Sequence, residues 1–119
     1  MSKKRAAPNI SFADSELRSY EWSARECNLG NLLIIYFNSW DNKTLKCTFT
    51  DPIQFSHLSG DCVEDLYQNL KITPFLEEAL SRNYIKVPID HPYKLFQVED
   101  IDEFPFIQVV AQNVEIIKE

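Results

Sequence analysis

The sequence predicts an α+β fold, in which a curved antiparallel sheet of about six strands is accompanied by two short helices in the order β-β-β-β-α-α-β-β. Three observations predict it. Apolar and polar residues alternate with a period of two in the first half of the chain and again near its end. Between these regions the period changes to 3.6. The chain has 119 residues, of which 45% are hydrophobic, enough for one core and a single globular domain over residues 12–119.

The first eleven residues are expected to form a flexible basic tail. Lys3, Lys4 and Arg5 precede Pro8, and the segment has almost no large apolar side chains. Such a composition offers little to a core.

Four consecutive antiparallel strands are predicted after this tail. Residues 17–26 give a mixed strand pattern, and residues 32–38 are so rich in branched and aromatic residues that they indicate a strand buried on both faces. A turn at residues 39–43 leads into residues 44–51, where apolar and polar residues alternate. After the Asp51-Pro52 break, residues 53–55 suggest a short edge strand.

Two helices are predicted next. In residues 61–70 the apolar side chains Val63, Leu66, Tyr67 and Leu70 fall at i, i+3, i+4 and i+7, with Asp61 as the N-cap residue and Glu64 in the position of a capping box. A second helix is expected to begin at Thr73-Pro74 and to end before Pro88. Its apolar stripe is formed by Leu76, Leu80 and Tyr84. Two closing strands, over residues 93–99 and 106–117, are joined by an acidic loop.

Charge bears on the class of partner. With 12 basic and 18 acidic side chains, the net charge is -6. An acidic domain repels nucleic-acid phosphates and anionic lipids, whereas it attracts a basic protein. We therefore expect a protein partner, or a second copy of the chain, and neither nucleic acid nor a membrane.

The cysteines and the start of the chain predict a cytoplasmic location. Cys27, Cys47 and Cys62 are odd in number and irregularly spaced, which fits a reducing compartment better than a disulfide framework. The basic start is followed by no apolar segment of the kind found in signal peptides. The longest apolar run, residues 32–37, is too short to cross a bilayer.

The sequence contains few of the residue patterns that are typical of enzymes. His57 and His91 lack metal-ligand spacing, and Gly30 and Gly60 lie outside any phosphate-binding motif, so no metal or cofactor is expected. A small cysteine-dependent enzyme built on His57 and Cys62 is the remaining catalytic alternative. Acidic neighbours of Cys62 argue against a reactive thiolate, so we predict a non-enzymatic protein.

Two features are candidate partner-binding surfaces. The first is the acidic stretch after residue 98, with Ile101 between its carboxylates. It is either a solvated connection or a docking loop whose carboxylates meet Lys or Arg and whose apolar residues anchor a partner. The second is Trp40, which is either a staple over the sheet or an exposed anchor at a hairpin tip. The candidate residues are Glu99, Asp100, Asp102, Glu103, Phe104 and Trp40.

The order of segments also carries a resemblance. The stretches ADSELRSYEW, LLIIYF and LKCTFTD, followed by two short helices and a closing strand pair, resemble small uncharacterised bacterial α+β proteins over residues 12–117. Some of these are of the toxin-neutralising immunity protein type. The resemblance implies an acidic immunity or inhibitor protein that engages a basic partner, and it carries over no binding residue. A structural or self-associating subunit is the alternative function.

Overall fold

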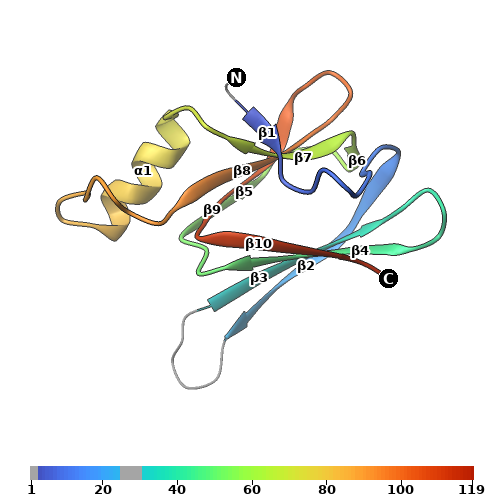
Figure 1. The fold of residues 1–119 in the computed structure, drawn as a ribbon, viewed down its shortest axis with the longest axis horizontal. Helices are drawn as coiled ribbons and strands as arrows, with labels where there is room; N and C mark the ends of the chain where they lie inside the picture. The colour runs from blue at the N-terminus through green and yellow to red at the C-terminus, as the bar shows by residue number, and fades with distance from the viewer. Residues whose placement is uncertain (1–2, 25–30) are drawn as a thin grey trace.

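The computed structural model describes residues 3–24 and 31–119, which form two curved antiparallel sheets and one helix (Figure 1). Sheet A has the strand order β1-β7-β8-β9-β5, and sheet B has the order β10-β4-β3-β2-β6. The strands are β1 (Lys3–Arg5), β2 (Ser15–Ala24), β3 (Asn31–Asn38), β4 (Thr44–Thr50), β5 (Gln54–His57), β6 (Cys62–Val63), β7 (Asp65–Asn69), β8 (Lys94–Glu99), β9 (Pro105–Ala111) and β10 (Asn113–Lys118).

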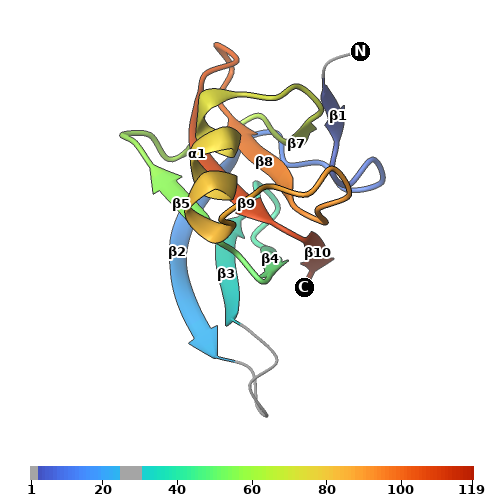
Figure 2. The same ribbon diagram turned by 90° about the vertical axis from the view of Figure 1, so that its left-hand side faces the viewer.

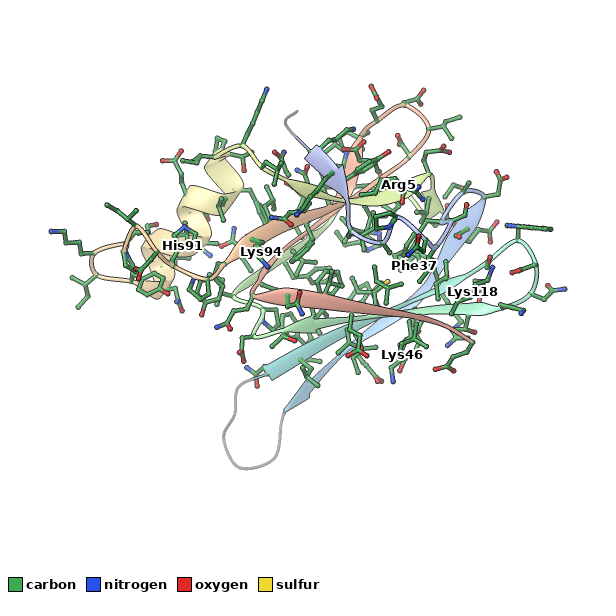
Figure 3. The ribbon with its side chains drawn as sticks, viewed as in Figure 1. Arg5, Phe37, Lys46, His91, Lys94 and Lys118 are labelled. Atoms are coloured by element: carbon green, nitrogen blue, oxygen red, sulfur yellow. The ribbon has the colours of Figure 1, made fainter. Side chains whose placement is uncertain are left out.

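The core lies between the two sheets. Alternate residues of β3 and β4 point inward, and a cross-strand row such as Phe37 opposite Leu45 is fully buried. Figure 3 shows Phe37 between the sheets and Lys46 on the outer face of sheet B. Phe12 is also fully buried and meets the Phe37 ring edge to face at 5.8 Å, so the segment before β2 belongs to the core.

Helix α1 (Pro74–Asn83) covers part of the outer face of sheet A, over β8 and β9 (Figure 2). As predicted, Thr73 is the N-cap residue, and its hydroxyl accepts a hydrogen bond from the Leu76 N–H. The predicted stripe residues Leu76 and Leu80 are buried against Leu95 of β8 and Val110 of β9.

The overall α+β character and the antiparallel pairing agree with the prediction, but the number of elements does not. The helix predicted over residues 61–70 is wrong, because this segment forms β6 and β7. Strand β7 runs between β1 and β8, and residues on these neighbouring strands lie opposite its polar residues and pair with them. Asp61 therefore precedes a strand and is not the N-cap residue of a helix. The described residues thus hold one helix and more strands than predicted.

Two further strand predictions also need correction. Residues 106–117 form two strands in different sheets, since the chain crosses from β9 to β10 at Gln112. Strand β5 leaves the sheet of its predecessor β4 and pairs with β9 in sheet A. The predicted strand over residues 17–26 corresponds to β2 up to Ala24, and its remainder, together with Cys27, lies outside the described residues.

The N-terminal segment was expected to be a tail, yet Lys3–Arg5 form β1. This short strand pairs antiparallel with β7, with Lys3 opposite Asn69 and Arg5 opposite Tyr67. Side chains of β1 also reach two buried carboxylates, described below. Residues 3–11 are therefore placed by strand pairing and ion pairs rather than by apolar burial alone.

Candidate functional site

The acidic loop, Asp100–Phe104, joins β8 to β9 and is held by one of its own carboxylates. The Asp100 Oδ1 atom accepts hydrogen bonds from the N–H groups of Asp102, at 2.9 Å, and of Phe104, at 3.0 Å. The Glu103 N–H donates to the Asp100 carbonyl at 3.0 Å, and Glu103 adopts a positive φ of 61°. An aspartate that bonds the backbone ahead of it is a common way to fix a tight turn. Asp100 therefore shapes the loop.

The other side chains of the acidic loop face solvent. Ile101 is 77% exposed and Phe104 is 46% exposed, although both are apolar. Asp102 is exposed, and the side chain of Glu103 retains 82% of its accessible surface. This arrangement places carboxylates beside apolar side chains on one projecting loop.

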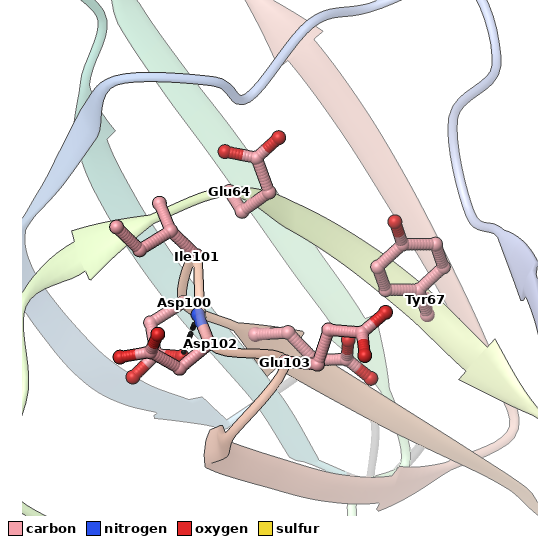
Figure 4. Close-up of a pocket in the computed structure, with 7 residues that line it drawn as sticks. Glu64, Tyr67, Asp100, Ile101, Asp102 and Glu103 are labelled. Atoms are coloured by element: carbon pink, nitrogen blue, oxygen red, sulfur yellow. Dashed lines mark hydrogen bonds between the residues drawn. The ribbon is translucent and has the colours of Figure 1, made fainter.

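An open pocket of about 440 Å³ adjoins this loop (Figure 4). Carboxylates dominate its wall, and Figure 4 shows Glu64 and Tyr67 on the chain segment next to the loop residues. We call it the acidic pocket. Its lining residues are Glu64, Tyr67, Glu99, Asp100, Ile101, Asp102 and Glu103.

Glu99 plays a different part from the one expected of it. It is buried, and its Oε1 atom accepts a hydrogen bond from the Lys3 ammonium at 2.7 Å. The pKa of Lys3 is raised above its usual value, chiefly by this hydrogen bond. The Lys3 Nζ atom also lies 4.3 Å from the centre of the Tyr67 ring. The structure thus engages Glu99 within the fold instead of presenting it to a partner.

A second ion pair lies beside the first. Asp65 is directly opposite Glu99 in the register of β7 and β8, and it is also buried. The Arg5 guanidinium donates to the Asp65 carboxylate and to the carbonyls of Pro8, at 3.3 Å, and Ile10, at 3.1 Å. Strand β1 therefore supplies a cation to each of two adjacent buried carboxylates, which removes much of the cost of burying them.

Trp40 lies at the exposed tip of the β3–β4 hairpin and is 70% exposed. The turn is fixed by Asn42, whose φ is 64°, and by an ion pair of 2.8 Å between Asp41 and Lys118. That interaction lowers the pKa of Asp41 to about 2. Because the Trp40 hairpin belongs to sheet B and the acidic loop to sheet A, the two project from different parts of the molecule (Figure 1). The structure does not unite them in one site.

Sequence reasoning missed Glu64 and Tyr67 as neighbours of the acidic loop. Both were assigned to the helix over residues 61–70, with Glu64 as a capping residue. They reach the acidic pocket because β7 pairs with β8, so that Asp65 lies opposite Glu99 and Tyr67 opposite Gln97. The long-range register that brings them there leaves no local signal in the sequence.

His57 and Cys62, the residues of the catalytic alternative, make hydrogen bonds to different neighbours. Cys62 lies in β6, and its S–H donates to Asp61 Oδ1 at 3.6 Å, which raises the pKa of the thiol. His57 Nε2 instead lies 3.1 Å from the Gly60 carbonyl oxygen, and its ring meets the Tyr20 ring edge to face. In the described ranges, no group of three or more metal-ligating side chains comes together. Nor does any helix there have the length and apolarity to cross a membrane.

Comparison of this chain with protein-family models, with curated proteins and with solved structures found no match.

Proposed function

We propose that this chain is a non-enzymatic protein-binding module whose acidic loop engages a basic partner. One observation carries the proposal: Asp102 and Glu103 stand exposed beside Ile101 and Phe104 on a loop already fixed by Asp100. Carboxylates that surround exposed apolar anchors are suited to a partner surface of Lys or Arg around an apolar pocket.

The fixed shape of the loop favours binding. Ordering a loop on association costs free energy, and a loop that is already ordered avoids much of that cost. Asp100 provides this order by accepting two backbone hydrogen bonds. Of the carboxylates around the acidic pocket, Glu99 pairs with Lys3 and Asp100 bonds its own loop. Glu103 lies 4.0 Å from the Lys3 ammonium but keeps 82% of its side-chain surface exposed, so it remains accessible to a partner together with Glu64 and Asp102.

An immunity or inhibitor role is the specific form of this proposal. A net charge of -6 accelerates association with a basic protein through electrostatic steering. A cytoplasmic location belongs to the same proposal, since the exposed thiol of Cys62 stays reduced there.

The test is quantitative binding with a matched pair of charge variants. Partners are captured from cell extract, identified, purified and titrated against wild type, D102N/E103Q and D90N/E115Q at low and high salt. Each variant loses the same charge, and Asp90 and Glu115 are exposed residues outside the acidic pocket. We expect D102N/E103Q to weaken binding by roughly tenfold and to reduce the salt dependence of binding, while D90N/E115Q binds like the wild type. Equal affinities for the two variants would refute the proposal.

Self-association is the second candidate function, and one observation favours it. Strand β2 pairs with β6 only through Ser15 and Glu16. Beyond Glu16, no strand among the described residues pairs with this edge of β2. Trp22, on this part of β2, is 54% exposed. An open edge with an exposed aromatic residue suits pairing with a second copy. Sedimentation velocity tests it: a mass that stays monomeric at every concentration excludes this candidate.

A further inference from the structure

Three polar residues, Lys4, Gln68 and Lys94, occupy the inner face of sheet A, where the fold otherwise places its core. The register of β1, β7 and β8 puts Lys4 opposite Gln68 and Gln68 opposite Phe96. Phe96 is buried and meets Phe49 of sheet B edge to face at 5.6 Å, so this cross-strand row faces the inside of the molecule. Lys94 precedes Phe96 by two residues on β8 and therefore shares this face.

These residues meet in a second open pocket, of about 350 Å³, at the mouth between the sheets. Figure 3 shows Lys94 beside the start of β10, and the Asn113 side of the pocket comes from that strand. The floor is apolar, formed by Phe96 and Val114. The full lining is Lys4, Arg5, Ala6, Pro8, Gln68, Lys94, Phe96, Asn113 and Val114.

The charge of this pocket is opposite to that of the protein. Acidic side chains outnumber basic ones by 18 to 12 in the chain, yet the part of the chain that the structure describes contributes cations and no carboxylate to this lining. Arg5 is held by Asp65 and by two backbone carbonyls. By contrast, Lys4 and Lys94 make neither an ion pair nor a side-chain hydrogen bond with any described residue.

From this arrangement we propose that the pocket binds a small organic anion. Its anionic group lies between Lys4 and Lys94, the side-chain amide of Gln68 donates a hydrogen bond to it, Asn113 lies at the rim, and its apolar body covers Phe96 and Val114. A volume of about 350 Å³ falls at the lower end of the range of small-molecule sites. Carboxylates and phosphates share the required chemistry, because both accept charge-assisted hydrogen bonds from ammonium groups.

This site is separate from the acidic loop. Successive residues of a strand point to opposite faces, so Lys3 reaches Glu99 on the outer face while Lys4 faces inward. The competing explanation is that Lys4, on the edge strand β1, only prevents pairing with another chain, and that Lys94 at the start of β8 is only a solvated residue. That explanation requires no affinity for any anion.

The experiment titrates the full chain with probes that separate charge from apolarity. Octanoate carries a carboxylate and an apolar body, octyl phosphate replaces the carboxylate, octanol lacks the charge, and inorganic phosphate lacks the body. Binding is measured by calorimetry and mapped by ¹H–¹⁵N spectra. The variant K4Q/K94Q is compared with K43Q/K86Q, which removes the same charge from exposed lysines outside the pocket.

We expect octanoate or octyl phosphate to bind more tightly than octanol and inorganic phosphate, and the tighter of the two identifies the anionic group. Shifts should centre on Lys4, Gln68, Lys94 and Asn113, and K4Q/K94Q should weaken binding by at least roughly tenfold, with K43Q/K86Q unchanged. Spectra of both variants report whether each is folded. Equal binding of octanol, equal effects of the two variants, or no binding of either anion to the wild type would each overturn the proposal.

Discussion

Replacing Lys3 by glutamine should destabilise the fold, because it leaves a buried carboxylate without its cation. The only side-chain hydrogen bond to Glu99 among the described residues comes from Lys3, and the Glu99 side chain is 7% exposed. Loss of Lys3 therefore leaves the buried Glu99 carboxylate unpaired on the outer face of sheet A and weakens the attachment of β1 to β7. This variant tests whether the basic N-terminal residues are part of the fold.

The expected magnitude follows from how deeply the pair is buried. Removing one partner of a fully buried ion pair costs roughly 3–5 kcal/mol. The Lys3 side chain is 33% exposed, so water reaches the vacated position, and we expect K3Q to lower the free energy of unfolding by roughly 2–3 kcal/mol. For a domain of this size the melting temperature should fall by roughly 8–12 °C. K3Q/E99Q should lose less than the sum of the two single variants, because no carboxylate remains to be stranded.

Chemical denaturation and thermal melting measure these differences. K4Q is the matched control, since Lys4 lies on the same strand without an ion pair and should stay within about 0.5 kcal/mol of the wild type. The raised pKa of Lys3 sets the pH range: its contribution is full below pH 10.5 and is lost as pH rises through the higher pKa of the folded state. If K3Q is as stable as K4Q at neutral pH, the account of β1 is wrong.

Three further predictions concern other parts of the fold. Replacing Thr73 by alanine removes the N-cap of α1 and should cost about 1 kcal/mol by chemical denaturation; no change would mean that the cap contributes nothing. D61N should accelerate alkylation of Cys62 at neutral pH, measured by mass spectrometry, because Asp61 raises the pKa of the thiol; an unchanged rate would contradict this cause. The pKa of Asp41 is lowered from 3.8 to about 2, so its stabilising contribution is present above pH 3.8 and is lost as pH falls through 2. In K118Q the melting temperature should depend less on pH over that range. An unchanged pH dependence would exclude Lys118 as the cause of the lowered pKa of Asp41.

Local sequence patterns predicted the elements that are stabilised by their own capping residues or by burial of many apolar side chains. The run over residues 32–38 is β3, and the alternation over residues 44–51 is β4. Helix α1 was predicted from Thr73, the proline after it and the apolar stripe, and these same features cap and bury it. For β4 and α1 the pattern of the sequence matches the face that the fold buries. Strand β3 was predicted to be buried on both faces, but the fold fully buries only the face that carries Leu33, Ile35 and Phe37.

The segment over residues 61–70 shows why the rest could not be predicted. Val63, Leu66, Tyr67 and Leu70 satisfy a helical period, while the polar residues of β7 obscure the period of a buried strand. Asp65 is compatible with burial only because Arg5, distant in sequence, pairs with it. Such compensation is a property of the tertiary structure.

The candidate site was predicted in part. The sequence located the acidic loop, but it did not distinguish the exposed Asp102 and Glu103 from Glu99, which the fold buries. Nor did it reveal that Asp100 shapes the loop or that Glu64 adjoins it. These distinctions depend on the hairpin geometry and on the pairing of β7 with β8.

The central claim is that the acidic loop contacts a basic protein, and the most direct measurement maps that contact. A ¹H–¹⁵N spectrum of the labelled chain is titrated with its purified basic partner. We expect the largest changes at the amides of Ile101, Asp102, Glu103 and Phe104, with smaller changes at Glu64. Saturable binding that leaves these signals unmoved and shifts the edge of β2 instead would contradict the claim.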